Sequence, residues 1–390
     1  MHKEYKIGLF IDSFFPILDG VIVSIDAVAK QLCKLADVTI FTAAPPDGKY
    51  DDSNLGYKVI RCKSKKIPFA KTLYWLPKPK SDKAFKVALK ESNLDLVHIH
   101  SPFPVGKMGL GYAKKNKIPV VSTLHSQFKK DFYTNTHSKI ISSIMTKVIM
   151  RVFNASDECW VANKACKELL HDYGSSKEPI IMPFGTHMSP IKDKAKAKEI
   201  VNKEYKLNDT ERIFLYVGRI DKLKNVFFIV EVLKVLKEKD YNFKMIFVGK
   251  GCDIQEFKKQ ISKYELCENV ILTGSISCRD ALARLYARAD MFVFPSFYDT
   301  DGIVRREAAC QHTPTICAEG SLIAKTVEPD HNGYTAPPNP EKFAQRIIDA
   351  LGDTQKHKSI SENAFNELYT SWETVAQNTF ARYKALIERN

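Results

Sequence analysis

The sequence predicts an α/β protein made of two doubly wound, Rossmann-like domains that face each other across a deep cleft. Short apolar runs alternate with helical patterns along the chain, which is typical of parallel sheets covered by helices on both faces. With 390 residues, the chain is too long for one ordinary core and suits two domains of roughly 150–200 residues each. A polar, lysine-rich stretch at residues 189–198 interrupts the alternation and indicates the junction.

The first half of the chain contains a series of apolar segments of strand length. We expect strands at residues 6–11, 38–41, 58–61, 96–99, 120–123, 158–161 and 180–183. Helical periodicity lies between them, at 24–35, 83–91 and 164–173. The first apolar run is interrupted by Asp12 and lacks a small-residue cleavage site, so we interpret it as a core strand and not as a signal peptide.

The alternation restarts after the junction. We expect strands at 213–217, 244–248, 270–272, 291–294 and 315–317, and a helix at 227–237. Residues 372–387 form a long amphipathic pattern, which predicts a terminal helix that packs across both domains. The predicted divisions are 1–186, 187–370 and 371–390. Because ligands of such folds bind at the carboxyl ends of the strands, we expect the site there.

The composition narrows the class of protein. Its 44% hydrophobic and 27% charged residues describe a globular chain, and no segment approaches the roughly 20 apolar residues of a membrane-spanning helix. The net charge of +14 favours an anionic partner, either a phosphorylated substrate or an anionic membrane surface. We find no motif for binding nucleic acid. The nine cysteines have no zinc-site spacing, which indicates reduced thiols in a cytoplasmic protein.

The segment at residues 292–310 carries the strongest chemical signal. A buried strand ends near Pro295, a loop follows, and a helix opens near Gly302. A helix N-terminus presents unsatisfied N–H groups and a partial positive charge, which suits a phosphate. Asp299 and Glu307 are eight positions apart, about two helical turns, so a helix could place both acids at one pocket.

These residues resemble the signature of family 4 glycosyltransferases, which are retaining enzymes of the GT-B fold. In that signature two acids are separated by seven residues, and a glycine follows three positions after the first acid. The resemblance implies that Glu307 binds the donor ribose and that Asp299 faces the donor sugar. It also implies that the backbone N–H groups of Gly302, Ile303 and Val304 meet the sugar and the diphosphate. Asp299 departs from the family, which has the longer Glu there.

The same letters allow a different interpretation. Asp299, Thr300 and Asp301 spell DxD, the metal-binding motif of GT-A glycosyltransferases, in which two carboxylates hold a divalent cation. That motif normally follows the first nucleotide-binding half and does not lie near residue 300 of two stacked α/β domains. We therefore expect no metal site and no cofactor besides the nucleotide-sugar co-substrate.

Three further segments of the second half match the family in order. Arg219 and Lys224 follow a strand and look like the pair that clamps the donor diphosphate, with Asn225 in place of a glycine. Asn accepts the left-handed backbone that a glycine would adopt there. By the same resemblance, the donor pocket is lined by Gly249, Gly251, Thr273 and Gly274, which end the next two strands.

The N-terminal half adds two groups of candidates. Asp19 and Gly20 resemble the family's glycine-bearing loop, with Gly20 near the donor phosphate and Asp19 on the acceptor side. His100 and His125 each follow a buried strand. A histidine in that place is more often a satisfied core residue, but His125 matches the family's imidazole that contacts the donor sugar. His100 is an acceptor-side candidate.

The resemblance implies metal-independent transfer of a hexosyl group from a nucleoside diphosphate sugar, with a UDP-sugar favoured, and with retention at the anomeric carbon. We expect the acceptor to be a membrane lipid such as diacylglycerol, or a cell-envelope glycan, because the sequence also looks similar to diacylglycerol glucosyltransferases within the family. The alternatives are a nucleotide-sugar 2-epimerase of the same fold, which would need no second acceptor, and a catalytically inactive sugar-binding partner.

Two basic and apolar segments of the N-terminal half suit an anionic membrane interface. One spans residues 63–80, and the other spans 139–153, where apolar residues at helical spacing alternate with Lys147 and Arg151. The second segment fits equally well a core helix with a solvated basic face. We expect a cytoplasmic protein, peripheral on the inner face of the cell membrane.

Overall fold

The computed structural model describes residues 4–48, 50–66 and 75–389. The chain divides into two compact units, the first made of residues 1–185 and 372–390 and the second of residues 186–371. Within the described residues, no helix combines the length and apolar character needed to span a membrane. All nine cysteines are described, and none forms a disulfide.

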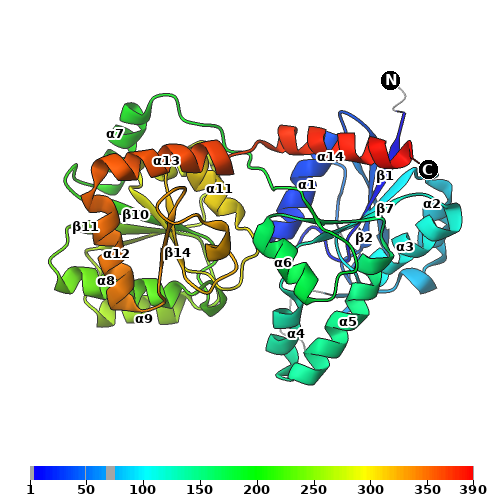
Figure 1. Ribbon diagram of the computed structural model, residues 1–390, viewed down its shortest axis with the longest axis horizontal. Helices are drawn as coiled ribbons and strands as arrows, with labels where there is room; N and C mark the ends of the chain where they lie inside the picture. The colour runs from blue at the N-terminus through cyan, green and yellow to red at the C-terminus, as the bar shows by residue number, and fades with distance from the viewer. Residues whose placement is uncertain (1–3, 49, 67–74, 390) are drawn as a thin grey trace. The chain divides into compact units, whose positions relative to one another are not determined.

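The first unit is built on a parallel sheet with the strand order β3-β2-β1-β6-β7-β8-β9 (Figure 1). Its strands are β1 (Lys6–Phe10), β2 (Asp37–Ala43), β3 (Lys58–Cys62), β6 (Leu96–Ile99), β7 (Val120–Leu124), β8 (Glu158–Val161) and β9 (Ile180–Ile181). The strands β4 (Ser64–Lys66) and β5 (Trp75–Pro77) form a separate antiparallel pair. The chain order reverses between β1 and β6, so this is the point at which such folds bind ligands.

Helices cover both faces of this sheet. The helices are α1 (Gly20–Leu32), α2 (Lys83–Glu91), α3 (Pro104–Asn116), α4 (Phe128–Thr136), α5 (Lys139–Ala155), α6 (Lys164–Asp172) and the terminal α14 (Trp372–Ile387). One buried cluster joins alternate residues of β1 to α1 and α14, and a second joins Phe10 and β2 to α2, α3 and α5. Successive side chains of a strand point to opposite faces of the sheet, so they pack into two cores, one on each face.

The second unit has its own parallel sheet, ordered β12-β11-β10-β13-β14-β15. Its strands are β10 (Arg212–Val217), β11 (Phe243–Val248), β12 (Val270–Gly274), β13 (Met291–Phe294), β14 (Thr315–Ala318) and β15 (Tyr334–Ala336). Its helices are α7 (Lys194–Tyr205), α8 (Val226–Glu238), α9 (Ile254–Lys263), α10 (Arg279–Arg288), α11 (Ile303–Cys310), α12 (Pro340–Gly352) and α13 (Thr354–Leu368). One large apolar cluster joins this sheet to its helices, and the order reverses between β10 and β13.

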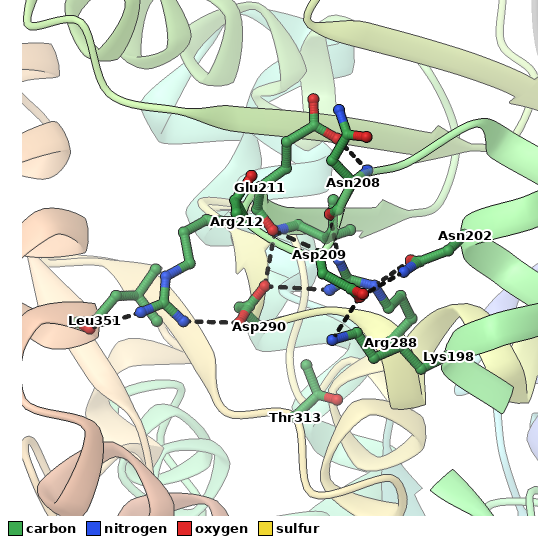
Figure 2. A network of polar contacts seen from close by, with 12 residues as sticks. Lys198, Asn202, Asn208, Asp209, Glu211, Arg212, Arg288, Asp290, Thr313 and Leu351 are labelled. Carbon is green, nitrogen blue, oxygen red and sulfur yellow. Dashed lines mark hydrogen bonds and ion pairs between the residues drawn. The ribbon is translucent and has the colours of Figure 1, made fainter. Parts of the chain in front are cut away.

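A polar network closes the amino end of the second sheet (Figure 2). Arg288 Nε donates to Asn202 Oδ1 of α7 at 2.6 Å, and its Nη1 lies 3.4 Å from Asp290 Oδ2. Asp290 also accepts from Arg212 Nη1 at 3.1 Å, and Asn202 donates to Asp209 at 3.0 Å. Each charge meets an opposite charge or a hydrogen-bonding partner, which is the pattern of a stabilising network.

Most predicted elements are confirmed, with errors at their ends. The helix predicted at 24–35 begins at Gly20, because the carboxylate of Asp19 accepts from Ile22 N at 2.9 Å and caps an earlier first turn. The strand predicted at 180–183 is shorter, Ile180–Ile181. The edge strand β15 was not predicted, since only three residues carry it. Of the basic and aromatic segment 63–80, residues 67–74 lie outside the described residues.

Candidate active site

Lys224 and Asp299 meet at the point where the strand order of the second sheet reverses. Lys224 lies in the short 3-10 turn after β10, and Asp299 lies in the loop after β13, the neighbouring strand. Lys224 Nζ is 2.5 Å from Asp299 Oδ1, and both side chains are mostly buried, with 15% and 17% exposed. Residues 75 positions apart are therefore brought together at the carboxyl edge of the sheet.

Asp221 organises the loop that carries the two predicted diphosphate cations. Its Oδ1 accepts from Lys224 N at 3.0 Å, and its Oδ2 lies 3.2 Å from Arg219 Nε. The Arg219 side chain remains 58% exposed. Asn225 adopts φ +58°, the left-handed conformation that the sequence allowed for it, and its Nδ2 donates to Pro295 O at 3.2 Å. The loop thus holds one cation in a buried ion pair and presents the other to solvent.

The predicted helix start at Gly302 is confirmed. Gly302 precedes α11 with φ +70°, and an added Cβ would lie 2.9 Å from the ring of Phe294. The N-cap residue, Gly302, has no side chain to bond the N–H groups of the first turn, which contains Ile303 and Val304. A helix N-terminus carries a partial positive charge, so this one can receive an anionic group.

Asp301, the second acid of the DxD letters, forms a buried bidentate ion pair. Its two oxygens accept from Arg306 Nε at 2.6 Å and from Arg306 Nη2 at 3.0 Å. Arg306 Nη1 donates to Leu368 O at 3.0 Å, which ties α11 to the end of α13. This carboxylate therefore has a structural partner, and the geometry gives no support to the metal-binding interpretation of the motif.

Glu307 lies buried on α11, with partners different from those of Asp299. Its Oε1 is 3.3 Å from Arg279 Nη1, and its Oε2 accepts from Tyr286 OH at 3.1 Å; both partners belong to α10. Burial raises the pKa of Glu307, and the positive charge of Arg279 opposes that rise. The two acids of the signature thus belong to two separate sets of contacts.

The glycines after β10 and β11 allow two loops to pack backbone against backbone. A Cβ on Gly249 would lie 1.8 Å from the carbonyl oxygen of Gly218, and one on Gly251 would lie 2.0 Å from that of Ile220. Gly249 N also donates to Gly274 O at 2.8 Å. The fold itself therefore requires these predicted donor-lining glycines, independently of any ligand.

Thr273 and Gly274 end β12 beside these loops. The hydroxyl of Thr273 donates to backbone carbonyl oxygens, to that of Phe247 at 3.3 Å and to that of Gly274 at 2.9 Å. Gly274 has φ +71°, a conformation that favours glycine. Hydrogen bonds between the loops therefore fix the backbone at this carboxyl edge of the sheet.

Three histidines form a cluster at the carboxyl edge of the first sheet. His98 lies near the end of β6, while His100 and His125 directly follow β6 and β7. The Nδ1 of His98 is 2.5 Å from Tyr383 OH of α14, and its Nε2 is 2.7 Å from Thr123 Oγ1. His100 Nδ1 is 2.9 Å from His125 Nε2. The predicted His100 and His125 are therefore partners of each other.

Burial keeps these imidazoles neutral. It lowers the pKa of His98 and of His100 well below the usual value and lowers that of His125 to about 3. The three rings line a small cavity of about 40 Å³ together with mainly apolar side chains, including Phe184, which stacks on His125. The cluster can donate or accept hydrogen bonds, but it brings no charge at neutral pH.

Asp19 and Gly20 lie at the start of α1, after β1. Asp19 serves as the cap of that helix. Gly20 has no left-handed conformation, and an added Cβ would meet nothing within 4 Å. Nothing in the described part of the unit therefore requires a glycine at this position, in contrast to Gly249 and Gly251.

The sequence analysis missed the partners of the predicted residues. Arg279 and Tyr286 hold Glu307, and Tyr383 holds His98 across 285 positions of the chain. No local pattern distinguishes these side chains from ordinary helix residues.

Comparison with protein families gives two matches that together span most of the chain. Residues 18–182 match the family model described as Glycosyltransferase Family 4, and residues 197–367 match that of Glycosyl transferases group 1. An alpha-monoglucosyldiacylglycerol synthase of Streptococcus pneumoniae is 30% identical over 80% of this chain and 70% of its own length. Another of the same name, from Acholeplasma laidlawii, is 25% identical over 99% of this chain and 98% of its own.

Solved structures support the fold. The sucrose-phosphate synthase of Thermosynechococcus elongatus superposes with a TM-score of 0.79 at 20% identity, over 99% of this chain and all of its own. Anabaena HepE, solved with UDP and glucose, gives a TM-score of 0.75 at 16% identity, over 98% of this chain and all of its own. The chain therefore belongs to the family 4 glycosyltransferases, enzymes of the GT-B fold.

Proposed function

We propose that the chain is a retaining hexosyltransferase that moves the sugar of a UDP-sugar, glucose in the first instance, onto diacylglycerol or a related lipid or glycan of the cell envelope. The observation that carries the proposal is the Lys224–Asp299 pair in the segments that lead to the start of α11, where Gly302 is the N-cap residue. A cation, an acid and a helix N-terminus in one place suit a diphosphate joined to a sugar.

In the proposed complex the donor lies along the carboxyl edge of the second sheet. The diphosphate forms ion pairs with Lys224 and the exposed Arg219. It accepts hydrogen bonds from the backbone N–H groups of Gly302, Ile303 and Val304 at the start of α11. Glu307, oriented by Arg279 and Tyr286, accepts from the ribose hydroxyls. The glycines Gly249, Gly251 and Gly274, with Thr273, line the pocket.

Catalysis in this proposal rests on the leaving group. Breaking the anomeric bond leaves a nucleoside diphosphate with one more negative charge, and fixed cations that face that charge lower the barrier. Arg219, Lys224 and the helix N-terminus supply this stabilisation, so we propose that no metal takes part. Asp299 contacts the sugar. By the family resemblance, His125 hydrogen-bonds to the donor sugar through its neutral imidazole, Gly20 approaches the donor phosphate, and Asp19 and His100 belong to the acceptor side.

The choice of donor and acceptor rests on relatives. The two alpha-monoglucosyldiacylglycerol synthases have names that specify a glucosyl group and diacylglycerol, and HepE was solved with UDP and glucose. These relatives favour a transferase over the 2-epimerase and over an inactive sugar-binding partner. A lipid acceptor resides in a bilayer, so we propose a peripheral protein on the cytoplasmic face of the membrane.

The test is transfer from UDP-glucose to diacylglycerol dispersed in neutral detergent, with EDTA present. We expect a glucosyl lipid whose anomeric configuration, measured by NMR, matches the α-linked donor, together with release of UDP. GDP-mannose serves as the competing donor. An inverted product would refute the retaining mechanism, and interconversion of nucleotide sugars without any glucosyl lipid would favour the epimerase.

A further inference from the structure

Helix α5 of the first unit carries two apolar faces. Its buried face consists of Ser142, Thr146, Ile149, Met150, Val152 and Phe153. Its other face is exposed and also apolar: Ile140 is 74% exposed, Ile141 47%, Ile144 57%, Met145 37% and Val148 37%. These five positions follow the spacing i, i+1, i+4, i+5 and i+8, so they share one side of the helix, opposite the core. We call this side the outer face of α5.

Among the described residues, the outer face differs from the rest of the surface, because it gathers five large exposed apolar side chains on one helix. Scattered exposed apolar side chains are ordinary, but a contiguous set on one helix marks a surface that another apolar medium covers. The sequence had allowed a core helix with a solvated basic face as the simpler explanation. The structure contradicts that alternative, because the side turned away from the core is itself largely apolar.

The charged residues around the outer face indicate what covers it. Lys139, Lys147 and Arg151 of α5 are exposed, and α5 contains no acidic residue. The neighbouring α4, which packs alongside α5, adds exposed Lys129 and Lys130. Apolar side chains flanked by cations match the layered chemistry of an anionic bilayer, with acyl chains below phosphate headgroups.

We propose that α5 docks on anionic phospholipid bilayers, with the outer face in the acyl boundary and its cations among the headgroups. The proposal deepens the proposed function, on which it rests for its purpose: docking gives the enzyme access to an acceptor that does not leave the membrane. Docking through α5 does not depend on donor binding, which we propose for the second unit.

The test measures binding to vesicles made of phosphatidylcholine alone or of equal parts phosphatidylcholine and phosphatidylglycerol. We expect the full chain to bind the anionic vesicles more tightly, and less so at high salt. The pair Lys147→Gln/Arg151→Gln should weaken binding by about fivefold for each removed cation, roughly 25-fold in all. The pair Ile140→Ser/Ile144→Ser should weaken it by about tenfold or more.

Matched controls lie on the second unit. Lys259→Gln/Lys263→Gln on α9 removes two exposed cations at the same spacing, and Ile200→Ser removes an apolar side chain of α7 that is 37% exposed. We expect both controls to bind vesicles like the wild type. All altered side chains are exposed, so thermal unfolding should change little in every variant.

Transfer to diacylglycerol in neutral detergent micelles separates the two proposals. If the α5 variants lose vesicle binding and keep micellar transfer, the docking proposal stands. If the wild type binds vesicles through α5 but transfers no sugar, the proposed function fails alone. Equal binding of wild type and α5 variants would overturn docking, as would concentration-dependent self-association that the Ile140→Ser/Ile144→Ser pair abolishes while vesicle binding persists.

Discussion

The carboxyl edges of the two sheets occupy equivalent positions in two similar folds, yet one edge carries neutral polar side chains and the other carries charged ones. The edge of the first sheet holds buried, neutral imidazoles that hydrogen-bond to one another and to Thr123 and Tyr383. The edge of the second holds the Lys224–Asp299 ion pair, the exposed Arg219 and the N-terminus of α11, which follows Gly302. A charged edge fits a diphosphate, and a neutral edge fits hydroxyl groups. This difference supports the proposed donor role of the second unit and the proposed acceptor role of the first.

The largest effect should come from the charged edge. Replacing Lys224 with Ala removes a cation from the proposed leaving group, and we expect kcat to fall by about 10²–10³-fold. Lys222→Ala is the control, because that exposed side chain pairs with Glu256 outside the proposed site. Steady-state kinetics with UDP-glucose measures both variants. Equal losses in both would mean that position 224 has no special role.

The second-largest effect should come from the glycines, because Gly249 at one edge is tightly packed and Gly20 at the other is not. Gly249→Ala forces a Cβ against the carbonyl oxygen of Gly218, so we expect the free energy of unfolding to fall by about 2 kcal/mol or more. Gly20→Ala meets no neighbour and should leave stability unchanged while raising the KM for the donor. Chemical denaturation and kinetics measure the two effects. If Gly20→Ala leaves both quantities unchanged, Gly20 does not approach the donor.

The neutral edge should show itself in the pH dependence of stability. The folded protein keeps its clustered imidazoles neutral, whereas the unfolded chain protonates them near pH 6.5. Below that pH the unfolded state therefore binds more protons than the folded state. The free energy of unfolding decreases as the pH is lowered, until the low folded pKa values are reached.

The variant His100→Gln should reduce this slope by about 1.4 kcal/mol per pH unit. Urea denaturation at pH values from neutral to mildly acidic measures the slope, and the comparison with wild type removes contributions from other groups. An unchanged slope in the variant would show that His100 is already protonated in the folded protein.

The smallest effect concerns the loop between the two cations. Asn225 has a left-handed backbone, so Asn225→Gly should change stability by only a few tenths of a kcal/mol, whereas Asn225→Ala should lose about 1 kcal/mol. Thermal unfolding of the two variants measures the difference. If Ala were as well tolerated as Gly, the left-handed conformation would not be what the position requires.

Local patterns were sufficient for much of the fold. The strands Leu96–Ile99, Glu158–Val161 and Met291–Phe294 and the helices Lys83–Glu91 and Trp372–Ile387 follow directly from hydrophobic periodicity, because each depends on its own residues. The helix start at Gly302 was predictable for the same reason. Errors arose where a side chain outside the periodic run decides the boundary, as Asp19 does for α1.

The contacts of the candidate site could not be predicted in this way. The pairing of Lys224 with Asp299 depends on the strand order, which places β10 beside β13. The pairing of His98 with Tyr383 depends on the return of the terminal helix to the first unit. Motif resemblance selected candidate residues, but it did not show that Gly249 serves loop packing or that Asp301 is held by Arg306.

Calorimetric titration of nucleotide sugars tests the central claim most directly, namely that the charged edge of the second unit binds the donor. We predict saturable binding of UDP-glucose with a Kd below about 1 mM, tighter than that of GDP-mannose. Lys224→Ala and Arg219→Ala should each weaken it, and His100→Gln should not. Absence of saturable binding of both nucleotide sugars at millimolar concentration, or binding that both charge-removing variants leave unchanged, would contradict the account.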